Sequence, residues 1–458
     1  MIRVQHLLFA SLLIAIPFYG FSFFNFRGQP VGRPDIVLSS LLAVAFVLDV
    51  VVAQRKVTFN RTMIWILLLN VATLLSTVNA FVNPGFSFAE FSTVAGQVAL
   101  GSVIVLAVSN FKVDKAEFTR YLQIWLLVSA AIGAYAIYQA FARNLGWPYA
   151  YLNLSNPTYV AETGAGQFGG FIRPSSVFFE PSRLGTYLVG PSFLAIITLG
   201  GRLGPDVLFR SRVVHWLVAL AIISGVVVSF ALSGYVALLF GVMVLFFSTR
   251  RALRVTQLAR IGMRVFVGIM FVIVIFQVFH VNFLSAFGRL SAIVAAPGKD
   301  GSLSQRAAYV VVGLRIFADN PIFGVGANQI QFASKAYTFP SWYAPVYASR
   351  ETGVAATGIM WIDVPAQSGL FGFIALALVF ASSLALLRQS MNWCTDPNGK
   401  VLSYAFYIAL WSTIASISLT HAELMLWVQF AFVHLLVNNV RRFGLFRDEP
   451  VTTYSTTA

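Results

Sequence analysis

Long apolar runs separated by short polar segments form the dominant pattern of this chain. A helix needs about 20 mostly apolar residues to cross a bilayer, and about twelve segments satisfy that requirement. The predicted spans are residues 7–26, 35–53, 62–82, 93–110, 119–141, 183–200, 213–231, 233–249, 263–282, 367–387, 402–420 and 423–440. The pattern therefore predicts an all-α, polytopic integral membrane protein.

Lysine and arginine residues are distributed unevenly between alternate loops. With the N-terminus placed in the cytoplasm, the inside segments carry 20 of the 31 lysine and arginine residues. The short outside turns 83–92, 232–234 and 421–422 carry none. Because loops rich in these residues remain cytoplasmic, both termini are predicted to be cytoplasmic. The chain is interpreted as one membrane domain, 1–450, followed by a disordered cytoplasmic tail, 451–458.

Composition excludes several other classes of protein. Hydrophobic residues make up 58% of the chain and charged residues 10%, whereas a soluble domain carries about 25% charged residues. The basic residues behind the net charge of +15 are scattered between apolar runs, which argues against nucleic-acid binding. A single cysteine, Cys394, allows neither an internal disulfide nor a Cys/His metal site.

The first long outer loop, about 142–182, ends in a candidate anion site. Pro181 favours the start of a helix that enters from the outer side, and helix N-termini attract phosphate. Arg173 and Arg183 would strengthen that field. The alternative is a capped helix whose arginines reach the membrane interface. Glu180 is a candidate helix-dipole partner, ion-pair partner or base.

The second long outer loop, about 283–366, contains a predicted helix over 303–318. The Asn-Pro pair at Pro321 ends that helix. Gly324 and Gly326 follow it and allow the backbone to approach another group closely. This arrangement of a helix, a proline stop and a Gly-Val-Gly run makes the loop a candidate binding segment.

Two arginines and several aromatic residues give this loop its candidate chemistry. Arg306 and Arg315 are nine residues apart, which places them on opposite sides of a helix, so they cannot both face one ligand from its middle. Either one lies beyond a helix end, or only one contacts the substrate. An interfacial amphipathic helix that touches lipid phosphates would show the same pattern. The aromatic residues of 336–347 suit sugar stacking or an ordinary membrane belt. His421 and Glu423, in the last outer turn, are candidate proton acceptors or capping groups.

These motifs and this layout resemble the superfamily of bacterial O-antigen ligases, O-antigen polymerases and exopolysaccharide polymerases. The similarity lies in Arg306 to Gly326, in Arg173 to Gly185, and in a large loop before the last three spans. The resemblance implies a type C glycosyltransferase-like fold, with a periplasmic loop between spans nine and ten. It also implies glycan transfer from undecaprenyl diphosphate with inversion, using neither metal nor nucleotide sugar.

The resemblance carries residue roles as well. It implies that Arg173, Arg306 and Arg315 hold the lipid diphosphate and act in catalysis, with Arg183, Gly324 and Gly326 as further diphosphate contacts. The general base stays open, with four candidates. They are Glu180, His421, Glu423 and Asp363.

One departure from the family pattern shifts the prediction between branches. The ligase branch shows a His-Asn pair shortly before the span that begins near Gln367, and residues 357–365 contain no such pair. This favours polymerisation of lipid-linked repeat units into exopolysaccharide, capsule or O-antigen at the periplasmic face of the inner membrane. The predicted partners are the lipid-linked donor and acceptor, membrane lipid and a chain-length regulator, and no cofactor is predicted.

Two other functions are kept open. An O-antigen ligase would use the same donor and a different acceptor. A transporter of lipid-linked sugar would show charged or broken helices at mid-membrane. The predicted spans have almost no mid-span charge, and Asp49 lies close to the inner end of its span.

Overall fold

The structure is a computed structural model of the chain, and it describes most of the residues. The described residues are 2–21, 24–26, 29–82, 85–151, 167–168, 171–178, 180–200, 208–209, 211–248, 262–263, 266, 270, 272–279, 281, 301–340, 358–418, 424–443 and 445–446.

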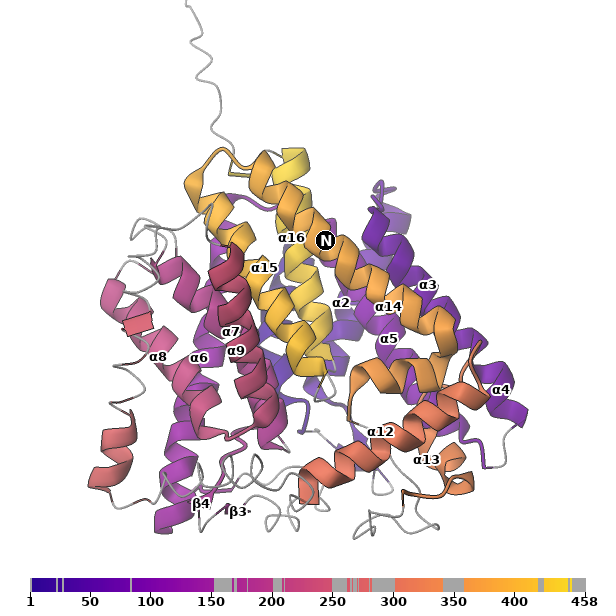
Figure 1. Cartoon of the computed structure of the whole chain (residues 1–458). Coiled ribbons are helices and arrows are strands. Elements are labelled where there is room, and N and C mark those ends of the chain that lie inside the picture. The colour runs from indigo at the N-terminus through magenta and orange to yellow at the C-terminus, as the bar shows by residue number, and fades with distance from the viewer. Residues whose placement is uncertain are drawn as a thin grey trace, which may run out of the picture.

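The described part of the chain is almost entirely helical, and most helices run side by side (Figure 1). The helices are α1 (Ile2–Ala15), η1 (Ile16–Phe18), α2 (Pro34–Val52), α3 (Arg61–Leu75), α4 (Thr77–Val82), α5 (Phe88–Ser109), α6 (Lys115–Leu145), α7 (Pro181–Gly200), α8 (Arg212–Val228), α9 (Leu232–Ser248), α12 (Gly301–Asp319), α13 (Ile330–Ala333), η6 (Ser334–Ala336), α14 (Met360–Trp393), α15 (Pro397–Ile417) and α16 (Leu424–Phe443). Two small antiparallel hairpins pair β1 (Phe24–Phe26) with β2 (Gln29–Val31), and β3 (Gln167–Phe168) with β4 (Phe171–Ile172).

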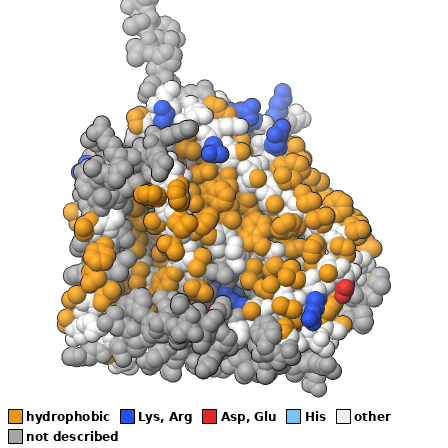
Figure 2. All heavy atoms as spheres, viewed as in Figure 1, with side chains coloured by type: hydrophobic (Ala, Val, Ile, Leu, Met, Phe, Trp, Pro, Cys, Tyr) orange, Lys and Arg blue, Asp and Glu red, His pale blue; other side chains and the backbone are white. Residues whose placement is uncertain are grey.

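The predicted polytopic membrane fold is confirmed. Within the described residues, seven helices are long and apolar enough to cross a membrane, and three shorter apolar helices accompany them. Each predicted span overlaps an observed helix except the ninth, 263–282, which lies largely outside the described residues. The first span was predicted to end too late, because the helical segment ends at Phe18 and residues 24–26 form β1. Hydrophobic side chains cover the middle of the face drawn in Figure 2, and several lysines and arginines lie along its upper edge.

Loops predicted to share the inner side do meet at one end of the bundle. The Arg55 guanidinium donates to the carbonyl of Asn110, which joins two of these loops. Lys115 forms an ion pair of 3.1 Å with Asp396, and the Asp396 amide donates to the carbonyl of Phe446. These contacts agree with the alternation that the charge pattern predicted.

Segments predicted to lie outside meet at the opposite end, the lower end in Figure 1, where β3, β4, α12 and α13 lie. The Asn79 side chain donates to the carbonyl of Gly324 over 3.0 Å. Ser87 and Gln329 exchange two hydrogen bonds, each of 3.1 Å. The second outer loop is therefore fastened to the turn between α4 and α5.

Small residues let neighbouring helices approach closely, as is common in membranes. A Cβ atom on Gly225 of α8 would lie 2.7 Å from the Cα atom of Gly133 on α6. A Cβ atom on Gly234 of α9 would lie 3.3 Å from the Cα atom of Gly185 on α7. The turn between α8 and α9 was predicted at 232–234, which is wrong. The turn lies at 229–231, and Gly234 serves packing instead.

The start of α14 also differs from the prediction. The span was expected to begin at Gln367, but the helix begins at Met360. Gly369 interrupts it with φ 64° and ψ −164°, a conformation that favours glycine. A Cβ atom at Gly369 would lie 2.0 Å from the carbonyl oxygen of Ile322. The helix therefore breaks where the second outer loop packs against it.

Candidate functional site

The first turn of α7 holds two of the predicted site residues. The carbonyl of Glu180 accepts hydrogen bonds from the amides of Arg183 and Leu184, so Pro181 occupies the first helical position as predicted. The Glu180 side chain is exposed. One of its carboxylate oxygens accepts a 2.8 Å hydrogen bond from the Ser182 hydroxyl. The carboxylate is therefore held beside the helix N-terminus and stays accessible.

Arg183 and Arg33, a residue that the sequence analysis did not select, both lie over the ring of Tyr19. The Arg183 guanidinium carbon lies 5.6 Å from the centroid of the Tyr19 ring, and that of Arg33 lies 5.5 Å from the same centroid. Both distances are within cation–π range. Arg33 also forms an ion pair of 2.7 Å with Asp35. The sequence offered one indication that Arg33 could belong to the site: it lies between the first two predicted spans, in a segment predicted to be outside.

Arg173 connects the first outer loop to the turn between α8 and α9. Its guanidinium donates to the carbonyl of Phe230 over 3.2 Å. Its own carbonyl accepts from the guanidinium of Arg143, which also donates to the Ser175 hydroxyl. Arg173 is half-buried, and its segment is held by contacts from both sides.

Arg306 and Arg315 lie on α12, whose bounds include the predicted helix. Its buried stripe consists of Ala308, Val312 and Ile316, and the two arginines lie on opposite sides of the helix because of their spacing. Arg306 is half-buried and Arg315 is exposed. The Arg315 guanidinium donates to the carbonyl of Thr338 over 2.9 Å.

A second contact fixes the end of α12 to the same segment. The Tyr337 hydroxyl donates to a carboxylate oxygen of Asp319 over 2.7 Å. Burial, together with the hydrogen bond to Asp319 and the charge of its carboxylate, raises the pKa of Tyr337 to about 12. The residues that follow α12 are therefore anchored beside Arg315.

The predicted Gly-Val-Gly run packs against the broken helix α14. A Cβ atom on Gly324, which has φ +67°, would lie 2.3 Å from the carbonyl carbon of Gln367. The amide of Gly324 donates to Asn320, and that of Gly326 donates to Gln367. The close approach expected from these glycines is therefore made to protein backbone, and both amides are already used there.

The four candidate bases have different surroundings. Glu180 is exposed, whereas Asp363, near the start of α14, has an exposed fraction of 0%. His421 and Glu423 lie outside the described residues. Among the described candidates, only Glu180 is accessible to an incoming substrate.

The arginines form two groups at the same end of the bundle. Arg173 lies beside the turn between α8 and α9, and Arg183 lies on the first turn of α7. Arg306 and Arg315 lie on α12, which packs on α14 and crosses the lower end of the bundle (Figure 1). The Arg33 and Tyr19 pair adds charge to the first group.

The fold and these segments define a polytopic membrane protein with the four predicted site arginines at its predicted outer end. A family model described as O-antigen ligase matches residues 216–377, which include α8, α9, α12 and the first part of α14. The match confirms the resemblance to the superfamily of O-antigen ligases and polymerases, whose members are glycosyltransferase-like enzymes of bacterial membranes. It includes Arg306 and Arg315, whereas Arg173 and Arg183 precede it. No curated protein matches the chain.

Proposed function

We propose that the protein polymerises undecaprenyl-diphosphate-linked oligosaccharide repeat units at the periplasmic face of the bacterial inner membrane. The observation that supports the proposal is the position of Arg173, Arg183 and Arg315 at the predicted outer end of a membrane bundle, in a chain whose residues 216–377 match a family model described as O-antigen ligase. Guanidinium groups grip phosphate in a forked geometry and keep their charge. The growing glycan on its lipid diphosphate is the donor, and the next lipid-linked repeat is the acceptor.

Electrostatic stabilisation of the leaving group is the main contribution of the protein. An acceptor hydroxyl attacks the anomeric carbon of the donor, and the bond from that carbon to the diphosphate oxygen breaks. The diphosphate leaves with the bonding electrons, and Arg173, Arg183 and the exposed Arg315 neutralise the charge that develops there. Arg306 lies on the opposite side of α12 and is left out of this contact. A single displacement of this kind inverts the anomeric centre.

The acceptor proton is assigned to Glu180 in this proposal. Its carboxylate is exposed and lies three residues before Arg183, on the first turn of the same helix. A base must reach the proton that it removes, which the full burial of Asp363 disfavours. We leave Gly324 and Gly326 out of the diphosphate site, because their amides already donate within the protein.

Ligation to another acceptor is the second candidate function, and the description of the matching family model favours it. The absence of a His-Asn pair in 357–365 favours polymerisation instead. The two differ in the acceptor alone, so the same arginine site serves either.

Reconstitution in detergent separates these functions. Purified protein supplied with one lipid-linked repeat unit is expected to yield a ladder of longer lipid-linked products. Transfer that occurs only after a different lipid acceptor is added would indicate a ligase. A deletion strain gives the parallel result in cells: single repeat units on the carrier for a polymerase, and full-length polymer stranded on the carrier for a ligase.

A further inference from the structure

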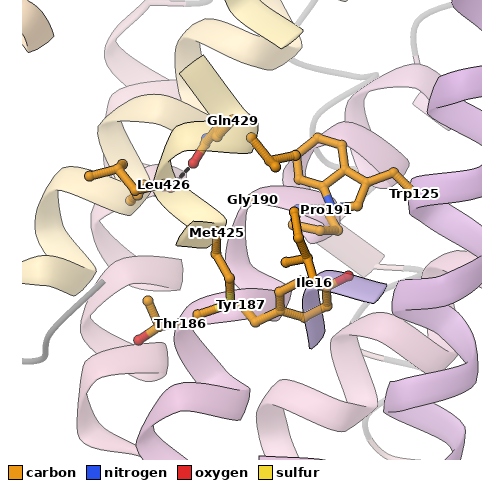
Figure 3. A pocket seen from close by; sticks show the side chains of 11 residues that line it. Ile16, Trp125, Thr186, Tyr187, Gly190, Pro191, Met425, Leu426 and Gln429 are labelled. Atoms are coloured by element: carbon orange, nitrogen blue, oxygen red, sulfur yellow. Dashed lines mark hydrogen bonds between the residues drawn. The ribbon is translucent and has the colours of Figure 1, made fainter. Parts of the chain in front are cut away.

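A small cavity of about 20 Å³ lies inside the bundle, between α6, α7, α15 and α16 (Figure 3). Tyr187, Gly190 and Pro191 of α7 form part of its wall, and Thr413 and Gln429 face them from α15 and α16. The other lining side chains are mostly apolar. Polar groups at this depth have no bulk water to pair with, so each of them needs a partner within the bundle.

The Gln429 side chain has one paired and one unpaired end. The Thr413 hydroxyl donates to its amide oxygen over 2.7 Å, the bond drawn in Figure 3. Gln429 is 5% exposed, and its amide nitrogen has no hydrogen-bond partner among the described residues. A Cβ atom built on Gly190 would lie 3.4 Å from that nitrogen. The amide nitrogen therefore lies against the α7 backbone, where the cavity opens.

Pro191 leaves an acceptor at the same place. It lies inside α7, and proline has no N–H to donate to the carbonyl four residues earlier. That carbonyl belongs to Tyr187, which lines the cavity. One amide donor on α16 lies at this cavity. On α7 the wall consists of Tyr187, Gly190 and Pro191, and the Tyr187 carbonyl, which points along the helix toward Gly190 and Pro191, lacks its usual helical donor.

We propose that this cavity binds one ordered water molecule, which joins the Gln429 amide to the Tyr187 carbonyl. Its volume of about 20 Å³ exceeds the roughly 10–15 Å³ that one water needs, and a buried water takes two to four polar partners. The water accepts the N–H of Gln429 and donates one hydrogen to the Tyr187 carbonyl. In the flipped orientation of the Gln429 amide, its oxygen faces the water. The water then donates to that oxygen and to the Tyr187 carbonyl, so the bridge is kept in either orientation.

The bridge has a structural consequence for the first turn of α7. Proline-broken membrane helices are stabilised when ordered water pairs the backbone groups that the proline frees. The water joins α7 to α16 at Tyr187, about one helical turn along α7 from Arg183. It therefore holds the segment that carries Arg183 and Glu180 at a fixed angle to the bundle. This inference is independent of the proposed glycan chemistry.

A double-mutant cycle on the purified full-length protein tests the bridge. Gln429→Met removes the amide and keeps the volume, and Pro191→Ala restores the missing N–H. We expect Gln429→Met to lower Tm in the Pro191 background, and to lower it by less than half as much in the Pro191→Ala background. The reason is that the Tyr187 carbonyl is then paired within α7. An equal decrease in Tm from Gln429→Met in the two backgrounds would overturn the proposal. Equal decreases would mean that Gln429 and Pro191 affect stability independently, because the effects of independent substitutions are additive.

Thr413→Val is the matched control. It removes the same hydrogen bond to Gln429 but leaves the amide nitrogen in place, so its loss in Tm is expected to be equal in both backgrounds. High-resolution density of the native protein gives a second readout that needs no variant to fold. A peak within hydrogen-bonding distance of both Gln429 Nε2 and the Tyr187 carbonyl supports the bridge. A filled cavity in which the two groups bond directly contradicts it.

Discussion

Arg33 and Arg183 lie over the same aromatic ring, with guanidinium carbons 5.5 and 5.6 Å from the centroid of Tyr19. They come from the loop before α2 and from the first turn of α7, so the fold brings together two cations that are distant in the sequence. Asp35 pairs with Arg33 and balances one of these charges. In the proposed function, Arg183 contributes from this pair to the contacts with the lipid diphosphate.

Replacement of Arg183 by lysine tests the role of its planar cation. Lysine keeps the charge but loses the forked donors and the stacking on Tyr19. We expect Arg183→Lys to lower the initial rate of glycan elongation by about tenfold or more at equal protein level. The rate is measured on lipid-linked repeat units with purified protein.

Arg388 offers a matched control for that variant. Its guanidinium carbon lies 5.9 Å from the centroid of the Tyr407 ring, near the end of α14 that faces the predicted inner loops. Arg388→Lys makes the same chemical change at the opposite end of the bundle, and we expect the rate to change by less than about twofold. If Arg183→Lys and Arg388→Lys lowered the elongation rate by similar factors, the stacking of arginine on tyrosine would matter for folding and not for the proposed site.

Substitution of Gly369 tests the packing of the second outer loop on α14. Gly369 has a positive φ, and an added Cβ would lie 2.0 Å from the Ile322 carbonyl oxygen. We expect Gly369→Ala to lower the free energy of unfolding by more than the roughly 1–3 kcal/mol of backbone strain alone. Thermal unfolding in detergent measures the loss.

Gly146→Ala isolates the strain component. Gly146 has φ +72°, and nothing lies within 4 Å of a Cβ atom built there. Its loss of stability is expected to be clearly smaller than that of Gly369→Ala. Equal losses would argue that the loop does not press against the break in α14.

The pH dependence of stability tests the anchor at the end of α12. The folded protein raises the pKa of Tyr337 to about 12, above the value of about 10 for a free tyrosine. Because the folded pKa is the higher one, the stabilisation is complete below about pH 10 and is lost as the pH rises through about 12. The Tm difference between the native protein and Tyr337→Phe should shrink over that window. A difference that stays constant to pH 12 would contradict the assignment.

The sequence predicted the membrane spans well because each span depends on a local property. About 20 apolar residues in a row can be recognised without knowing their neighbours. Pro181 and Pro321 likewise marked helix ends by chemistry that belongs to the residue itself. The start of α7 and the end of α12 were therefore predicted to within a residue or two.

The prediction failed where a contact from elsewhere in the chain decides the local structure. The turn before α9 was predicted at 232–234, yet Gly234 lies within α9 and packs against Gly185 of α7. The break at Gly369 depends on Ile322, and the convergence of Arg33 on Tyr19 depends on how α2 meets the end of α1. Such long-range contacts cannot be deduced from spacing or composition.

The most direct test of the central claim is the elongation rate of Arg315→Lys relative to Tyr337→Phe. Both side chains fasten α12 to 337–338, but only the arginine can grip a diphosphate in two places. We predict that Arg315→Lys loses at least about tenfold in rate at an unchanged Tm, whereas Tyr337→Phe keeps a rate close to that of the native protein. Normal rate and glycan length from Arg315→Lys would contradict the account.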